Sequence, residues 1–278
     1  LEMRGLNLRF DHGSPFLTPP QMQAIAEQMS SPAHPVPFDV ATHSALGDES
    51  LICIADGMNQ VGKWLARGLQ VHLNRGVTAI AQSDSARQWQ IVTADDVVAD
   101  DFDLVITATP PRQAAEILRL SDSALVTTLN AIEPQGCWSL MLVTQTSLPM
   151  GLVEHPKGEI IERVINENAK GRFSEHLGLY TVHAKRPWSQ RHMESPKVDV
   201  QTAMIETLQS FGLESQNILH AQLHRWLYAG VVQPLGQPNL ADMQRGLYCA
   251  GDWCLGNDID CALASANATA TQVIQSLA

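Results

Sequence analysis

The part of the sequence that most restricts the fold lies near the C-terminus, where a short apolar segment is followed by Gly251-Asp252 and then by a helix pattern. Residues 247–250, Leu-Tyr-Cys-Ala, are typical of a buried strand. The run that begins near Asp260 is rich in small residues and contains neither Gly nor Pro, which predicts a helix that packs closely on a sheet. Gly251 allows the backbone to approach another group closely. The pattern therefore predicts a polar pocket, or else a plain turn with a solvated Asp252.

A second apolar segment, residues 104–109, predicts another strand of the same sheet. Its run Leu-Val-Ile-Thr-Ala-Thr is continuous, which is typical of strands buried on both faces of a parallel sheet. The run stops at Pro110-Pro111, and residues 112–120 then place apolar side chains on one face of a helix. Together with the C-terminal strand and helix, this pattern indicates an α/β domain whose two parts are far apart in the sequence.

The rest of the chain shows different patterns. Prolines punctuate the first third, so only residues 19–29 predict a helix there and the remainder is expected to be mostly loop. Apolar residues at helical spacing predict a helix over 57–69, and strand material follows over 71–80. Residues 137–228 contain short strand patterns with one helix inserted at 200–212. This middle part is expected to form an antiparallel sheet with a helix, an α+β arrangement.

Composition excludes several classes of protein. With 45% hydrophobic and 17% charged residues, the 278-residue chain is typical of a globular protein, and no apolar run approaches the roughly 20 residues of a membrane span. A formal net charge of −11 disfavours nucleic acid as a partner and favours a small-molecule substrate. The first residues lack the basic and apolar regions of a signal peptide, so a cytoplasmic location is expected.

The five cysteines are expected to be reduced, because their number is odd and their spacing matches no disulfide framework. Cys249, Cys254 and Cys261 lie close together in the sequence, but the gaps between them do not match a zinc site. These three residues are interpreted as small buried hydrophobic residues, and no metal is expected.

Five sequence blocks occur together in an order and spacing that carry a family resemblance. They are FDHGSPFLT at 10–18, GMNQVGKWLARGLQVHLNRGVTAI at 57–80, DLVITATPPRQAAEIL at 103–118, HRWLYA at 224–229 and GLYCAGDWCLGNDIDCALASANATA at 246–270. Each block is weak alone, but the combination is specific. The chain resembles the flavin-containing amine oxidase superfamily and, within it, the renalase-like bacterial branch.

The resemblance implies a fold of the α/β plus α+β class with two discontinuous domains. A partial FAD/NAD(P)-binding Rossmann-like domain is expected from residues 56–120 and 237–278. A substrate domain built on an antiparallel sheet is expected from residues 16–55 and 121–236, with the flavin ring at the junction of the two domains. The implied function is that of an FAD-dependent oxidoreductase, which oxidises an amine or a reduced nicotinamide by hydride transfer to the flavin.

The resemblance also assigns roles to single residues. In similar proteins the Gly-Asp that ends the last strand lies against the ribitol and pyrophosphate of FAD, and the positive N-terminus of the next helix points at the flavin. The implied cofactor-binding residues are Gly251, Asp252, Trp253, Asp260, Ala262, Val77, His12 and Gly13. The candidates for contact with substrate are Trp226, Tyr228 and His224, although such aromatic residues and histidines also occur as structural core residues. No catalytic residue stands out.

One part of the family pattern does not occur in these 278 residues. Family members carry a strand, a Gly-x-Gly-x-x-Gly turn and a helix, followed by an acidic residue that holds the adenosine ribose. Because this unit of roughly 30 residues is missing, FAD binding is expected to be weak or absent. Its loss is also expected to leave apolar edges on the strands at 104–109 and 247–250. A second copy of the chain in a homo-oligomer, or residues 3–10, would cover these edges.

Three explanations of the missing unit are open. The chain is a shortened or mis-started form of a longer protein, or another segment or a second copy fills the gap, or the protein is a degenerate relative that no longer binds FAD. The last explanation implies an alternative function. The protein would then be a catalytically inactive, flavoprotein-like domain that binds a small molecule or a partner chain.

Overall fold

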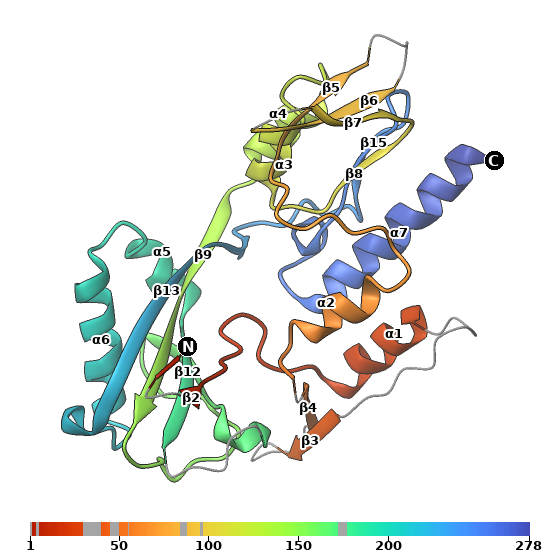
Figure 1. Cartoon of the computed structure of the whole chain (residues 1–278). Coiled ribbons are helices and arrows are strands. Elements are labelled where there is room, and N and C mark those ends of the chain that lie inside the picture. Colours follow the sequence, from red (N-terminus) through yellow and green to blue (C-terminus); the bar gives the residue numbers. More distant parts are fainter. Residues whose placement is uncertain are drawn as a thin grey trace. The chain divides into compact units, whose positions relative to one another are not determined.

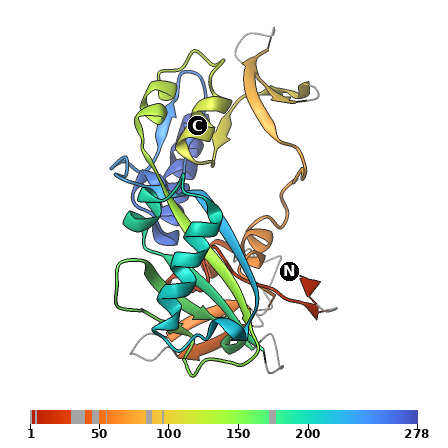
Figure 2. The same cartoon turned by 90° about the vertical axis from the view of Figure 1, so that its left-hand side faces the viewer.

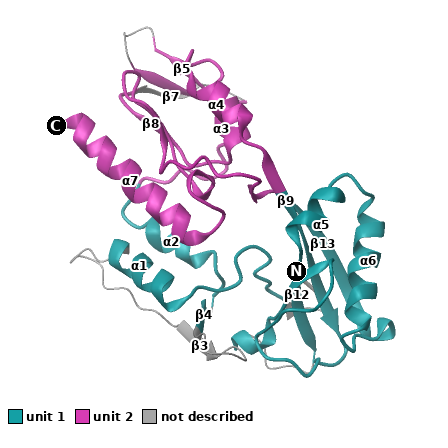
Figure 3. Ribbon diagram, turned by 180° about the vertical axis from the view of Figure 1, so that it is seen from behind, with its two compact units in different colours: residues 1–69, 136–227 teal, residues 70–135, 228–278 magenta. Residues whose placement is uncertain are grey.

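The computed structural model describes residues 2–3, 6–29, 40–44, 50–54, 56–83, 88–94, 97–171 and 177–278. The chain forms two compact units, each made of two stretches of sequence. Unit 1 contains residues 1–69 and 136–227, and unit 2 contains residues 70–135 and 228–278 (Figure 3). The units thus divide after residues 69, 135 and 227, whereas the predicted domains divide after residues 55, 120 and 236. The assignment of one domain to the nucleotide and the other to the substrate stays a prediction.

Unit 1 is built on a five-stranded sheet with the strand order β10-β11-β12-β9-β13. The bounds are Val153–Glu154 for β10, Ile161–Asn166 for β11, Gly178–Ala184 for β12, Pro134–Thr144 for β9 and Ile218–Val231 for β13. The first four strands pair antiparallel with their neighbours in this order. The sheet confirms the antiparallel content that was predicted for the middle of the chain.

The two faces of this sheet differ in chemistry, because side chains alternate between the faces along each strand. The apolar face packs against α5 (Arg186–Arg191) and α6 (Lys197–Gln209), and both Figure 1 and Figure 2 show α6 lying along the sheet. Its buried core includes Trp138, Leu140, Leu142, Val164, Val182, Val200, Met204 and Leu208. The opposite face carries the buried polar residues Ser139, Thr181 and His183. This face therefore places buried polar groups on the side of the sheet opposite to the apolar core.

The N-terminal part of unit 1 contains more regular structure than the sequence indicated. Its elements are β1 (Glu2–Met3), β2 (Leu6–Asn7), α1 (Pro19–Met29), β3 (Val40–Ser44), β4 (Ser50–Ile54) and α2 (Gln60–Leu65). α1 confirms the helix predicted for residues 19–29, and α2 is shorter than predicted. The remainder was expected to be mostly loop, but the described residues also include two short strand pairs, β1 with β2 and β3 with β4. Proline spacing shows where helices cannot continue, but it says little about short strands between the prolines.

Unit 2 contains a mixed three-stranded sheet with the order β14-β15-β8. Its elements are β5 (Val77–Gln82), β6 (Trp89–Thr93), β7 (Val97–Phe102), β8 (Val105–Thr107), α3 (Pro111–Ile117), α4 (Leu125–Ala131), β14 (Leu240–Asp242), β15 (Leu247–Cys249) and α7 (Ile259–Leu277). β15 and β8 pair in parallel, with Leu247 opposite Val105 and Cys249 opposite Thr107. This pairing confirms that the two apolar segments recognised in the sequence share one sheet. β5, β6 and β7 form a second, antiparallel sheet.

Two expectations about these strands need correction. β15 is not an open edge, because β14 pairs with it on one side and β8 on the other. β8 is an edge strand of the described sheet, and its central residue Ile106 is 49% exposed, so the strand is not buried on both faces. The predicted strand material over 71–80 begins as a strand only at Val77. A continuous apolar run does not by itself show which strands lie beside it, and the neighbours decide burial.

α7 confirms the helix that was predicted to begin near Asp260. The predicted close packing is made by its small residues, since Ser265 and Thr269 are the residues it buries. Ser265 Oγ accepts a hydrogen bond of 3.0 Å from the backbone N–H of Gly251, which ties the helix to the end of β15. Within the described ranges, neither α7 nor any other helix is long and apolar enough to cross a membrane.

Candidate functional site

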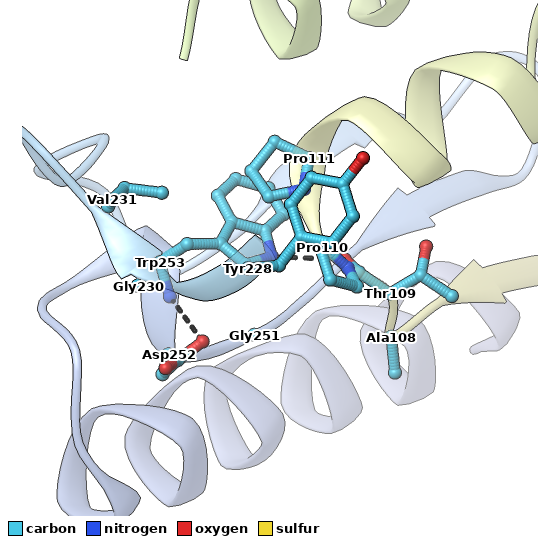
Figure 4. Close-up of a pocket in the computed structure, with 10 residues that line it drawn as sticks. All are labelled: Ala108, Thr109, Pro110, Pro111, Tyr228, Gly230, Val231, Gly251, Asp252 and Trp253. Atoms are coloured by element: carbon cyan, nitrogen blue, oxygen red, sulfur yellow. Dashed lines mark hydrogen bonds between the residues drawn. The ribbon is translucent and has the colours of Figure 1, made fainter. Parts of the chain in front are cut away.

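A pocket of about 90 Å³ opens in unit 2 at the carboxyl ends of the parallel strands β8 and β15 (Figure 4). It is lined by Ala108, Thr109, Pro110, Pro111, Tyr228, Gly230, Val231, Gly251, Asp252 and Trp253. Ligands of open α/β sheets commonly bind at this end of the strands, where the chain leaves the sheet. The pocket brings together four of the predicted site residues, namely Gly251, Asp252, Trp253 and Tyr228.

Gly251 provides room for a neighbouring side chain. A Cβ atom at this position would overlap Nε1 of Trp253. The indole is 3% exposed and donates a hydrogen bond of 3.2 Å from Nε1 to the carbonyl oxygen of Thr109. Trp253 therefore joins the ends of β15 and β8, and its ring belongs to the core of unit 2.

Two polar groups in the pocket suit a hydroxylated ligand. Oγ1 of Thr109 is buried and has no hydrogen-bond partner. The carboxylate of Asp252 is half-buried and accepts a hydrogen bond of 2.9 Å from the backbone N–H of Trp253. A pocket whose lining includes an orphaned hydroxyl and a carboxylate is a site where a sugar or ribitol hydroxyl group gains partners. The pocket residues thus fit part of a flavin nucleotide.

The N-terminus of α7 has a different character. The side chain of Asp258 caps the helix and accepts a hydrogen bond of 2.8 Å from the backbone N–H of Cys261. Asp260 adds a second acidic residue in the first turn and is exposed. The backbone N–H of Ala262 bonds to the carbonyl oxygen of Asp258 at 3.1 Å. Two acidic side chains offset the positive end of the helix dipole, so this terminus is a poorer anion site than the resemblance implies.

A second group of predicted residues meets in unit 1. The ring centroids of His12 and Trp226 are 5.2 Å apart with the planes nearly parallel, and His224 lies 4.9 Å from His12 and 4.5 Å from Trp226. Gly13 follows His12, and a Cβ atom added at Gly13 would lie 3.6 Å from the indole of Trp226. Four predicted residues thus form one aromatic cluster, which we call the His12 cluster. Val77, by contrast, lies at the start of β5 in unit 2 and is 38% exposed.

The backbone of His12 is held by three donors from three strands. Its carbonyl oxygen accepts hydrogen bonds from Ser139 Oγ at 3.0 Å, from His183 Nε2 at 3.1 Å and from Trp226 Nε1 at 3.1 Å. Because a carbonyl only accepts, Nε2 of His183 carries the hydrogen. Burial lowers the pKa of His183 to about 4, so this ring is neutral near pH 7. Burial and the nearby His224 also lower the pKa of His12, whose Nδ1 is buried without a partner.

A buried ionic network anchors the residue before His12. Nζ of Lys170 lies 3.0 Å from Asp11 Oδ2 and 2.8 Å from Glu167 Oε2, and the Lys170 side chain is 0% exposed. Glu167 Oε1 accepts a hydrogen bond of 2.6 Å from Thr181 Oγ1, and Asp11 Oδ1 accepts one of 3.0 Å from the backbone N–H of Met58. Neither this network nor His183 stands out in the sequence. The only local signal is the spacing of three between Glu167 and Lys170, which also occurs on many exposed helices.

The cysteines agree with the interpretation as hydrophobic residues, most clearly for Cys249 and Cys254. Both side chains are fully buried, and burial raises each pKa to about 11. Cys261 is half-buried, and all five cysteines are free thiols. In the part of the chain that the structure describes, no three His, Cys, Asp or Glu side chains gather in a way that could hold a metal ion.

Comparison with known proteins gives one consistent family. The model of the family described as flavin containing amine oxidoreductase matches residues 42–274. Mouse renalase is 25% identical over 227 residues, which are 76% of this chain and 65% of that protein. The chain therefore spans less than two thirds of this relative.

Solved structures show the same fold. An oxidoreductase from Methanosarcina mazei superposes with a TM-score of 0.58 at 16% identity, over 90% of this chain and 59% of its own. Wild-type putrescine oxidase bound to putrescine superposes with a TM-score of 0.56 at 12% identity, over 82% of this chain and 54% of its own. These likenesses confirm the predicted fold class of α/β plus α+β with a partial Rossmann-like domain.

Proposed function

Because the chain belongs to the family of flavin-containing amine oxidoreductases, as the sequence blocks indicated, we propose that it acts as part of an FAD-dependent oxidoreductase. The observation that carries this proposal is the pocket at the ends of β8 and β15, whose lining includes the carboxylate of Asp252 and the buried hydroxyl of Thr109, which has no partner among the described residues. No other pocket residue is charged. The site therefore suits a ligand that offers hydroxyl groups.

The residues of unit 2 would hold the ribitol part of the cofactor. Asp252 would accept hydrogen bonds from ribitol hydroxyl groups, and Thr109 would donate or accept one more. Pro110, Pro111 and Tyr228 add apolar surface around these polar groups. When bound, FAD supplies the redox chemistry by accepting a hydride equivalent from the substrate. The protein supplies orientation and a dry environment.

For the substrate, we propose that the His12 cluster of unit 1 binds a flat or amine-bearing group. The indole of Trp226 offers a π face, and the rings of His12 and His224 offer nitrogen atoms. Burial lowers the pKa of both histidines, so both are neutral near pH 7 and can accept a hydrogen bond from an N–H group. An amine and a reduced nicotinamide amide both carry such groups, and these are the two proposed substrate classes.

The decisive experiment is a titration of FAD into the purified chain, followed by flavin fluorescence. We expect weak binding, because these residues contain no glycine-rich turn for the pyrophosphate. Asp252→Ala should weaken binding further by about 1–3 kcal/mol, since ribitol hydroxyls lose a charged acceptor. Glu133→Ala changes an exposed acid of unit 2 that does not line the pocket, so this variant is the matched control and should leave the affinity unchanged.

Three outcomes separate the candidates. Submicromolar affinity would show that another segment replaces the glycine-rich turn and would overturn the expectation of weak binding. Equal affinity of the parent chain and Asp252→Ala would remove Asp252 from the site. Complete lack of binding would favour the alternative of a catalytically inactive binding module. If FAD binds, bleaching of the flavin band near ~450 nm under anaerobic conditions by an amine or by a dihydronicotinamide would identify the substrate class.

A further inference from the structure

Arg163 lies in a row of polar residues that crosses the sheet of unit 1. It is on β11 directly opposite His183 of β12, and His183 is directly opposite Ser139 of β9. Directly opposed residues of antiparallel strands share a face, so all three side chains belong to the polar face. His183 and Ser139 both donate hydrogen bonds to the carbonyl oxygen of His12. The row therefore leads from Arg163 to the His12 cluster.

The guanidinium group of Arg163 has no hydrogen bond or ion pair to the residues that the structure describes. Its Nε is buried and makes no hydrogen bond, and the described residues provide no ion pair to the group. Arg225 of the same sheet is a useful contrast. It donates a hydrogen bond of 2.8 Å to the carbonyl oxygen of Met193, lies 3.8 Å from Glu194 and packs over the ring of Trp138.

The charges near Arg163 are mixed in sign, and its burial is the dominant feature of its environment. Burial is the main reason why its pKa is lowered, and the charge of Arg186 at the start of α5 lowers it further. Glu162 acts in the opposite direction but is exposed and forms no ion pair with Arg163. The neighbouring thiol of Cys137 is protonated, because burial raises its pKa. A half-buried guanidinium group whose buried Nε makes no hydrogen bond costs stability unless an acceptor joins it.

We propose that Arg163 binds an oxyanion, either a carboxylate or a phosphate, of the small molecule that occupies the polar face of the sheet. The planar guanidinium group presents N–H donors in a fork that matches the two oxygens of such an anion. The identity of this molecule as the substrate of the flavin reaction rests on the proposed function. The anion site itself does not, and it can be measured without flavin.

The first test compares stability and anion binding in Arg163→Met. Thermal unfolding is followed with sodium phosphate or sodium succinate, against sodium chloride at the same ionic strength. The parent chain should gain stability from at least one of the two anions, because a ligand that binds only the folded state raises the unfolding temperature. Arg163→Met should lose this gain, and its unfolding temperature without anion should equal or exceed that of the parent chain. The reason is that methionine keeps the apolar stem and removes a cation without a partner.

Arg191→Gln is the matched control, because Arg191 is an exposed arginine of the same unit at the end of α5. This variant should keep the full response to the anion. A clear loss of thermal stability in Arg163→Met, with the anion response retained, would show that Arg163 is a structural residue and would overturn the proposal. So would equal responses to phosphate, succinate and chloride.

A second test observes the side chain directly. The Nε–Hε resonance of Arg163, assigned through the variant, should shift on titration with the effective anion, and the resonance of Arg225 should not. The apparent affinity should fall by about tenfold or more in Arg163→Lys, which keeps the charge but loses the paired donors. The relative response to phosphate and succinate distinguishes the two classes of oxyanion. An anion response without FAD binding would support the anion site and count against the flavin site. FAD binding without an anion response would support the flavin site and overturn the anion site.

Discussion

Gly251 and Trp253 show how closely the turn after β15 is packed. The indole folds back over the glycine, and its Nε1 reaches the carbonyl oxygen of Thr109 at the end of β8. The backbone of Gly251 is extended, so conformational freedom is not the reason for glycine here. The reason is the space that a Cβ atom would need. The same turn carries Asp252, and the shape of the pocket therefore depends on the indole staying in place.

Gly251→Ala should destabilise the protein by about 1–3 kcal/mol, because the new methyl group displaces the indole and breaks its hydrogen bond to Thr109. Urea unfolding followed by tryptophan fluorescence measures the change. Gly62→Ala is the control, since a Cβ atom at Gly62 of α2 meets nothing within 4 Å. Alanine in a helix should raise stability by about 0.5–1 kcal/mol. Equal effects of the two substitutions would contradict the packing described for Gly251.

His183 should make the stability of the protein depend on pH. Its pKa is about 4 in the folded state, below its ordinary value near 6.5, because burial disfavours the charged ring. The folded state therefore resists protonation, and this contribution to stability is complete above pH 6.5 and is lost as the pH falls toward 4. The loss amounts to about 3 kcal/mol.

His183→Gln keeps a donor for the carbonyl oxygen of His12 but cannot be protonated. The free energy of unfolding of this variant should decrease less between pH 6.5 and pH 4.5 than that of the parent chain. Urea unfolding at a series of pH values gives both curves. Parallel curves would show that His183 is accessible to protons in the folded protein.

β8 is the element whose surroundings depart most from the pattern of a buried parallel strand. It pairs with β15 on one side and has no strand on its other side in the described part of the chain. Its residue Ile106 is 49% exposed. An unpaired apolar edge is a site where another strand can add. Coverage of this edge by a second copy of the chain or by residues 3–10 stays a prediction.

If a second copy covers the edge, the chain should self-associate at micromolar concentration, and Ile106→Lys should shift it toward the monomer. Sedimentation velocity measures the distribution. Ile274→Lys on α7, where the isoleucine is 67% exposed, is the control and should leave the distribution unchanged. A parent chain that stays monomeric at about tens of micromolar would contradict the homo-oligomer.

The ionic network of Lys170 joins parts of unit 1 that are far apart in the chain. It connects Asp11 with Glu167 and Lys170, and through hydrogen bonds it reaches Met58 and Thr181. The network thereby holds the loop that presents His12 against the polar face of the sheet. Lys170→Met leaves two buried carboxylates without the ammonium group that bridges them.

We expect Lys170→Met to cost about 3–5 kcal/mol of stability, as measured by urea unfolding. Lys157→Met, at an exposed position of the same unit, should cost less than about 0.5 kcal/mol. Glu167→Gln should cost less than Lys170→Met, because it leaves one carboxylate beside the ammonium group. A cost for Lys170→Met as small as that of Lys157→Met would mean that the network is open to water.

Much of the secondary structure was predictable, because helix starts, turns and apolar periods are local signals. α1 matches the predicted helix over 19–29. α6 runs over Lys197–Gln209 rather than 200–212, since the helix begins directly after Pro196 and ends before the turn at Gly212. The candidate site was predictable where residues lie on recognisable blocks, as for His12, Trp226 and Asp252. It was not predictable where the role depends on strand register, as for Arg163 and His183.

The sequence by itself determined the strand, the Gly-Asp turn and the helix at the C-terminus, the parallel pairing of β8 with β15, and the family. These follow from apolar runs, turn residues and block order, all of which are local or additive signals. Only the tertiary structure decided which charged residues are buried. In the sequence Lys170, Arg163 and His183 look like ordinary exposed residues, because burial is a property of the neighbours that folding brings together. The register of β11 and β12 places Arg163 against His183, and no local pattern encodes that contact.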